Sequence, residues 1–130
     1  MDKRLENFTD LNVYRTAFEL QQRIFEITIR FPHEESYSLT DQIRRSTRSI
    51  GANIAEAWQK RRYPAHFISK LTDSQAEQAE TQHWLVTCLE CKYIKQSEYD
   101  ELAKTCTRIG RMLGQMIKKA NTFCRNEKVD

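Results

Sequence analysis

Apolar residues recur at steps of three and four along most of the chain, and the first such stretch covers residues 11–30. This spacing predicts an amphipathic α-helix, because residues three and four apart share one helix face. The residues expected on the core face are Leu11, Tyr14, Phe18, Phe25 and Thr28, with Ala17 and Ile24 beside them. Thr9 or Asp10 is expected to cap this helix. Pro32 should end it, because a residue before proline avoids the helical region.

The same period predicts a second helix over residues 39–61 and a third over residues 64–91. Ser38 begins a sequence that resembles a capping box, and Pro64 occupies a favoured first-turn position. Gly51 lies inside the second pattern and costs stability relative to alanine, so we expect it to permit a close contact between helices. The middle of the third helix, residues 72–83, carries no apolar side chain larger than alanine.

A fourth apolar stripe runs from Tyr99 to Phe123, and Ser97 begins another sequence that resembles a capping box. No segment shows the alternation of a half-buried strand, and short connections force neighbouring helices to run antiparallel. The sequence therefore predicts an all-α fold, an antiparallel up-down-up-down four-helix bundle. We expect residues 1–8 to form an N-terminal extension, residues 9–124 the bundle domain, and residues 125–130 a frayed C-terminal tail.

Composition agrees with one small helical domain. The chain has 130 residues, of which 39% are apolar and 30% charged, and its three glycines and two prolines are too few for the turns of an all-β domain. No apolar run reaches the length of a transmembrane helix, so no membrane association is expected. The first residues lack the apolar core of a secretory signal, which favours a cytoplasmic protein.

The four cysteines do not predict a disulfide framework, because the expected compartment is reducing. Cys88 and Cys91 have the spacing of a metal knuckle, but the second pair of a zinc ribbon is missing and both lie in a helical pattern. They are interpreted as buried or half-buried helix residues. No metal and no cofactor are expected.

The formal net charge of +3 hides a strong alternation along the chain. Residues 1–36 carry a net charge of −2, residues 37–71 of +5, residues 72–101 of −5 and residues 102–130 of +5. Such asymmetry can mark a nucleic-acid surface. The alternative is that neighbouring elements neutralise each other within one fold.

Short turns allow facing positions of adjacent helices to be paired, and this register favours the second interpretation. The expected ion pairs are Arg45–Glu80, Arg108–Glu80, Arg48–Glu77 and Arg111–Glu77. Residues three apart lie on one helix face, so each set forms a ladder. The third helix would then lie between two basic helices, and the ladders would explain why its middle lacks large apolar residues.

One long motif resembles a known family. Residues 36–56, SYSLTDQIRRSTRSIGANIAE, are similar to the signature of the bacterial 23S rRNA intervening-sequence proteins, which are also described as ribosomal-protein-like. The turn that begins at Phe31-Pro32 and the later segment Cys91-Lys92-Tyr93-Ile94 also fit, and the resemblance covers about residues 7–120. It departs at Ala57, where the commoner family form has glycine. The resemblance implies a four-helix bundle, a homopentamer and an association with rRNA intervening sequences.

Two functions remain open, and an enzyme is not expected because no nucleophile–base arrangement or phosphate-cradling glycine loop is present. The first is an oligomeric nucleic-acid-associated protein that binds RNA or DNA phosphates with basic residues. Its candidate residues are Arg44, Lys60, Arg61, Arg62, Tyr63, Arg111, Lys118 and Lys119. The second is a homo-oligomeric scaffold without nucleic-acid contact, whose candidate interface residues are Trp58, Trp84 and Tyr93.

Overall fold

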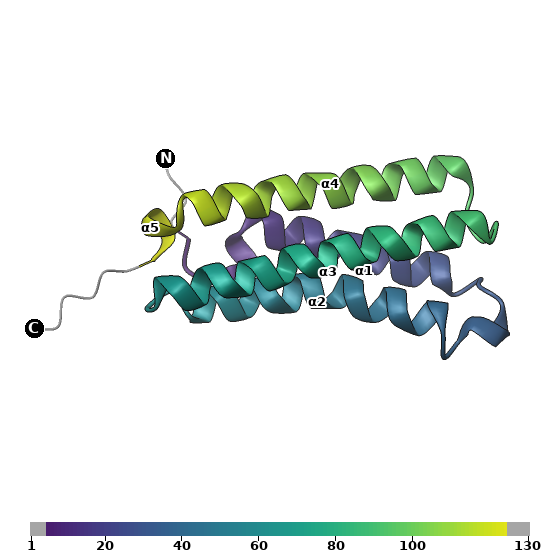
Figure 1. Cartoon of the computed structure of the whole chain (residues 1–130), viewed down its shortest axis with the longest axis horizontal. Helices are drawn as coiled ribbons and strands as arrows, with labels where there is room; N and C mark the ends of the chain where they lie inside the picture. The colour runs from purple at the N-terminus through teal and green to yellow at the C-terminus, as the bar shows by residue number, and fades with distance from the viewer. Residues whose placement is uncertain (1–4, 125–130) are drawn as a thin grey trace, which may run out of the picture.

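Four long helices run antiparallel along the molecule, as the computed structural model of the chain shows (Figure 1). The structure describes residues 5–124, so the expected tail at residues 125–130 and the first four residues of the expected extension lie outside it. The elements are η1 (Phe8–Asp10), α1 (Asn12–Thr28), η2 (His33–Glu35), α2 (Leu39–Gln59), α3 (Pro64–Glu90), α4 (Gln96–Lys118) and α5 (Ala120–Phe123). No strand occurs within the described range. The predicted four-helix bundle is confirmed.

Helix α1 confirms part of the predicted core face, since Leu11, Ala17, Ile24 and Thr28 are buried, but it is rotated away from the aromatic residues of that prediction. Its buried face carries Val13, Ala17, Leu20, Ile24 and Ile27. The expected core residues at positions 18 and 25 are instead 44% and 36% exposed. Helix α1 carries two apolar stripes. The aromatic stripe is interrupted by two glutamines at positions 21 and 22, whereas the aliphatic stripe is unbroken and packs inward.

The middle of α3 contacts α2 through small polar side chains. The Ser74 hydroxyl donates to the backbone carbonyl of Ile50 at 2.8 Å, and the Thr81 and Ser46 hydroxyls lie 2.9 Å apart in a hydrogen bond. Ser46, Ser74 and Thr81 are fully buried. Small side chains allow two helices to approach closely, and α2 and α3 are the most extensively packed pair. This contact explains the absence of large apolar residues better than the predicted ladders do.

Gly51 does not mark the tightest helix contact. A Cβ atom at this buried position would lie 3.4 Å from Cε1 of Tyr14, an ordinary contact distance. A Cβ atom at Gly110 of α4 would lie only 3.1 Å from Oε1 of Gln78 on α3. The close approach predicted at Gly51 therefore occurs at Gly110.

The helix caps also differ from the predicted ones. Leu11 is the N-cap residue of α1 and makes no side-chain cap, while Asn7 and Asp10 cap the short helix η1. Ser38 makes no cap bond either, and the Glu35 carboxylate accepts from the N–H of Leu39 at 3.3 Å. Helix α4 begins at Gln96, earlier than predicted, because the Glu98 carboxylate accepts from the N–H of Lys95 at 2.9 Å. These caps depend on chain direction before the helix, which residue type alone does not fix.

Candidate nucleic-acid interface

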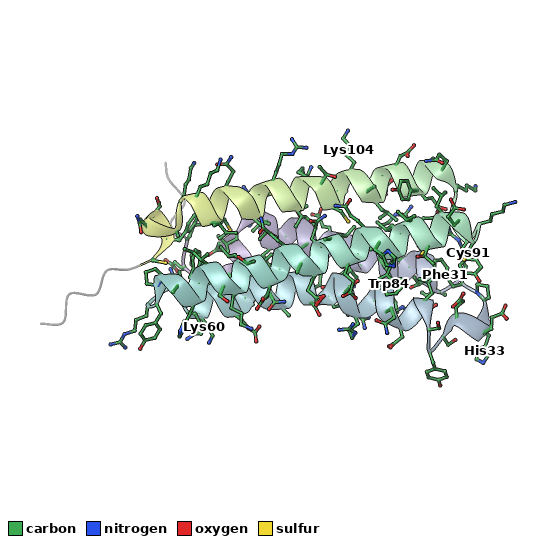
Figure 2. All side chains as sticks on the ribbon, viewed as in Figure 1. Phe31, His33, Lys60, Trp84, Cys91 and Lys104 are labelled. Atoms are coloured by element: carbon green, nitrogen blue, oxygen red, sulfur yellow. The ribbon has the colours of Figure 1, made fainter. Side chains whose placement is uncertain are left out.

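The turn between α2 and α3 forms an aromatic and basic cluster at one end of the bundle. Figure 2 shows Lys60 at this end, opposite the end that carries Cys91 and His33. Tyr63 is 54% exposed, with the Arg62 guanidinium 5.9 Å from its ring centroid. The Tyr63 ring also contacts the His66 ring, and their centroids lie 5.4 Å apart. An exposed aromatic ring beside cations is the arrangement that stacks on unpaired bases.

Arg61 has a structural role, in contrast to the exposed residues of the same run. Its guanidinium carbon lies 3.6 Å from the ring centroid of Trp58, and its Nε donates to the Trp58 carbonyl at 2.8 Å. The side chain thus closes the C-terminus of α2, where a cation is favoured by the helix dipole. Arg61 is therefore a poor candidate for phosphate contact.

The end of α4 brings further basic residues to the same end of the molecule. The end of α4 and the α2–α3 turn lie at the same end of the bundle in Figure 1. Helix α5 packs on the start of α3, where the Phe67 and Phe123 rings stack at 6.1 Å. Lys118 and Lys119 are exposed there, and Arg111 lies seven residues before Lys118 on the same face of α4. The fold thus brings candidates of the α2–α3 turn and candidates at the end of α4 to one end of the bundle (Figure 1).

This surface, the basic end, combines the α2–α3 turn with the end of α4. Its residues are Lys60, Arg62, Tyr63, Lys118 and Lys119. All five are exposed. The arrangement can offer several phosphate contacts and one stacking ring to a single nucleic-acid strand.

Arg44 lies elsewhere, at the other half of α2 and against α1. Its Nε donates to Oγ1 of Thr28 at 2.8 Å, and its guanidinium carbon lies 4.6 Å from the ring centroid of Phe25. Burial, and then the charge of Arg48, lower the pKa of Arg44 below its usual value. Arg44 is thus a second basic position, separate from the basic end.

One of the predicted ion pairs is present and the other three are absent from residues 5–124. Arg45 and Glu80 pair at 3.5 Å, as predicted. Arg48 lies instead beside the Phe25 ring, 5.7 Å from its centroid. Arg108 turns to α1, where it donates to Oγ1 of Thr16 at 3.4 Å.

The geometry of three adjacent helices explains why the ladders fail. Helix α3 contacts α2 on one side and α4 on another, so one carboxylate row cannot face both. Glu80 faces α2, while Gln78 and Gln75 are the α3 residues nearest to the α4 glycines 110 and 114. The Glu77 pairs with Arg48 and Arg111 were therefore wrong, as was the pair between Arg108 and Glu80.

The aromatic interface candidates are placed differently from one another. Trp58 is only 7% exposed and belongs to the core of the chain, so it is not the exposed contact residue that was expected. Trp84 is half-buried, and its Nε1 donates to the Glu80 carboxylate at 3.1 Å (Figure 2). Tyr93 is also half-buried and donates to the Glu35 carboxylate at 2.9 Å, which raises the pKa of Tyr93 to about 12.

Sequence reasoning missed an exposed apolar stripe on the outer side of α1. Its residues Phe18, Phe25 and Ile29 are 44%, 36% and 65% exposed. The signal was present in the sequence, because the first helix carries more apolar residues than one face can hold. This stripe is an exposed apolar surface that a partner could cover, whereas Trp58 of α2 is buried in the core.

The cysteines form no site. All four thiols are free, and residues 5–124 contain no group of His, Cys, Asp and Glu that could hold a metal ion. Burial raises the pKa of Cys88 and of Cys106 to about 12. Cys91 is exposed at the end of α3, so the prediction that both residues of the pair are buried or half-buried was wrong for Cys91.

Helices long and apolar enough to span a membrane are absent from the described part of the chain. What remains is an all-α antiparallel bundle with exposed basic residues gathered at one end. The described residues thus define a small helical-bundle protein.

The family model of the 23S rRNA-intervening sequence protein matches residues 9–115. The chain belongs to this family, as the motif in α2 predicted. Among solved structures, it is similar to a protein of unknown function from the S23 ribosomal protein family of Bacteroides thetaiotaomicron. The two share 32% sequence identity with a TM-score of 0.73, over 82% of this chain and 95% of that one. A search of the curated proteins gave no match.

Proposed function

We propose that this chain is a non-enzymatic, homo-oligomeric protein of the bacterial cytoplasm that binds nucleic acid through its basic end. The observation that carries the proposal is that Lys60, Arg62, Lys118 and Lys119 are exposed at the end of the bundle that also exposes the Tyr63 ring (Figure 1). Cations at several points of a surface bind the phosphate backbone with little sequence preference, and an exposed ring adds stacking on unpaired bases. The family's link with rRNA intervening sequences favours RNA as the partner.

The proposal is tested by titrating purified protein into labelled structured RNA and DNA at 50 and 200 mM salt. We expect binding that weakens steeply with salt, because counterions are released from each neutralised phosphate. The double variant Lys60→Gln/Lys118→Gln should reduce the slope of log affinity against log salt by about two. Lys104→Gln, on the outer side of α4 (Figure 2), is the control that removes a charge outside the basic end, and it should leave affinity within about twofold. Absent binding at 50 mM salt, or binding that ignores salt, contradicts the proposal.

Tyr63→Ala separates stacking from charge. Removal of the ring should weaken the binding of single-stranded RNA by about 1–3 kcal/mol and leave the binding of duplex RNA nearly unchanged. An equal loss for both forms would contradict a stacking role for Tyr63.

The alternative is a homo-oligomeric scaffold that makes no nucleic-acid contact, and the exposed stripe on α1 favours its oligomeric part. Phe18 and Ile29 are apolar side chains that a second copy would remove from water. The resemblance to the family implies a pentamer. Measurement of the mass of the protein in solution tests self-association. The double variant Phe18→Ser/Ile29→Ser should lower the mass of the assembly while leaving the helix content unchanged. A monomeric wild-type protein would exclude both the pentamer and the scaffold.

A further inference from the structure

A groove along α2 is lined mainly by polar and basic side chains. Its volume is about 430 Å³, and its lining residues are Ser36, Thr40, Asp41, Arg44, Arg45, Arg48, Ser49 and Ala52. The lining thus contains three arginines and one carboxylate, that of the exposed Asp41. The groove is separate from the basic end, which lies at the opposite end of α2.

Aromatic and hydroxyl contacts hold two of these arginines without neutralising them. The Arg44 guanidinium is fixed by the hydrogen bond from its Nε to Thr28 and by the Phe25 ring, and Arg48 lies over the same ring. Neither arginine forms an ion pair with any residue between positions 5 and 124. Arg45 is already paired with Glu80, so the free charge of the groove belongs to Arg44 and Arg48.

A buried hydroxyl group in the same groove lacks a partner. Thr40 is 7% exposed, and its Oγ1 atom is buried with no hydrogen bond to any residue from 5 to 124. Buried polar groups are normally paired, and an unpaired one destabilises the fold. Its position in the lining of a cationic groove indicates that a ligand with acceptor oxygens completes it. The nearby Ser49 hydroxyl, by contrast, already donates to the Arg45 carbonyl at 2.8 Å.

We propose that this groove binds a phosphate group, held by Arg44 and Arg48 and by a hydrogen bond from the Thr40 hydroxyl. Guanidinium groups match the oxygens of phosphate in charge and in planar donor geometry, and anchored guanidinium planes lose little freedom on binding. The proposal rests on the proposed function in one respect: the phosphate source is the backbone of the bound nucleic acid. A free phosphate offers the same chemistry and is the alternative source.

The groove itself is tested with inorganic phosphate, followed through the arginine Nε–H and Thr40 amide resonances of the full-length protein. Phosphate should shift these resonances, and Arg48→Gln should weaken its binding about tenfold. Lys104→Gln should change it less than twofold, because Lys104 lies on α4, away from the groove. Equal losses for both variants would overturn the site and indicate a general charge effect.

Thr40→Val provides a readout that charge removal cannot. Valine has nearly the shape of threonine and removes the unpaired hydroxyl, so the melting temperature should stay or rise while phosphate binding weakens severalfold. Undiminished binding in this variant would overturn the role of Thr40. Lower binding together with a lower melting temperature would also count against it, because damaged packing would then explain the loss.

A parallel RNA titration distinguishes the two phosphate sources and separates this proposal from the proposed function. If Arg48→Gln reduces the salt slope of RNA binding by about one, the groove contacts the backbone. If RNA binds but neither groove variant affects RNA or phosphate binding, the groove proposal is wrong and the proposed function stands. If inorganic phosphate shifts the groove resonances but RNA does not bind at 50 mM salt, the proposed function is wrong and the phosphate site stands with a free phosphate as its ligand.

Discussion

Lys92, just after the end of α3, has a backbone conformation that residues other than glycine rarely adopt. It has a φ of 62°, in the left-handed region that favours glycine. The N–H of Tyr93 donates to the Cys88 carbonyl at 3.0 Å, and the N–H of Lys92 to the Leu89 carbonyl at 2.9 Å. These bonds end α3 in the manner of a glycine C-cap. Because a lysine occupies the position, no glycine marks this helix end in the sequence.

Lys92→Gly should therefore raise the free energy of unfolding by about 1 kcal/mol, because glycine adopts this conformation without a Cβ clash. Lys104→Gly is the matched control, since it places the same substitution inside α4, where it should lower the free energy of unfolding by about 1 kcal/mol. Chemical denaturation of the three proteins gives both values. A loss of stability in both variants would contradict a strained Lys92.

Thiol reactivity separates the cysteines. Cys91 is exposed, whereas burial raises the pKa of Cys88 and Cys106 to about 12 and also raises that of Cys124. Because the thiolate is the reactive form, Ellman's reagent at pH 8 should label one thiol quickly and the others only on unfolding. Cys91→Ser should abolish the fast phase, and Cys106→Ser should leave it. A fast phase that survives Cys91→Ser would contradict this assignment.

At the scale of the element, Glu98 fixes the start of α4 and ties it to α1. Its carboxylate accepts from the N–H of Lys95 and from Arg30, both Glu98 oxygens lying 2.6 Å from the Arg30 Nη2. The Lys95 N–H and the Arg30 guanidinium lower the pKa of Glu98 despite an opposing effect of burial. A carboxylate at this position also interacts favourably with the helix dipole.

This lowered pKa makes α4 sensitive to acid. A carboxyl group with a lower pKa in the folded protein stabilises the fold above its unfolded pKa, and this contribution is lost as pH falls through the folded pKa. The melting temperature should therefore decrease once the pH drops below about 4.5, the ordinary pKa of a glutamate side chain. Glu98→Gln should melt lower than wild type at pH 7, with the difference shrinking by pH 3. A constant difference between these pH values would contradict the ionic role.

At the scale of the whole molecule, ion pairs connect neighbouring helices of the bundle. The acidic residues Glu98 and Glu101 pair with Arg30 and Arg23 of α1. Lys70 of α3 pairs with Glu56 of α2 at 3.3 Å. Neighbouring helices thus neutralise each other in part, but through other pairs than the predicted ladders. Such exposed pairs contribute little stability, and the packing of the buried faces holds the bundle together.

The close α2–α3 contact gives a prediction at this scale. Ser74 is fully buried against α2, so Ser74→Leu should lower the free energy of unfolding by about 1–3 kcal/mol through overpacking. Ala76→Leu makes a similar change at an exposed position of the same helix and should have an effect below about 0.5 kcal/mol. Denaturant titration compares the two. If Ser74→Leu were as stable as wild type, ion pairs rather than close packing would explain the polar middle of α3.

The four helices could be predicted because period and proline are local signals. Three- and four-residue steps placed all four long helices, and Pro64 marked the start of α3. The caps were missed because each depends on how the preceding chain approaches the helix. In α4, the N-cap residue is Lys95, which no propensity rule would select, and its backbone N–H donates to the Glu98 carboxylate three residues later. The candidate site was predicted only as a set of basic residue types, since their exposure depends on packing.

By itself, the sequence determined the number of long helices, their antiparallel order and the family, because short-range periodicity and one long motif carry that information. Tertiary structure alone decided which of two apolar stripes of α1 faces the core. It also decided which side of α3 each carboxylate faces, and that Arg44 and Arg48 lie over one Phe25 ring in the groove that Thr40 lines. The physical reason is rotation about the helix axis. Periodicity defines the faces of a helix, but only the neighbours packed against it select which face is buried.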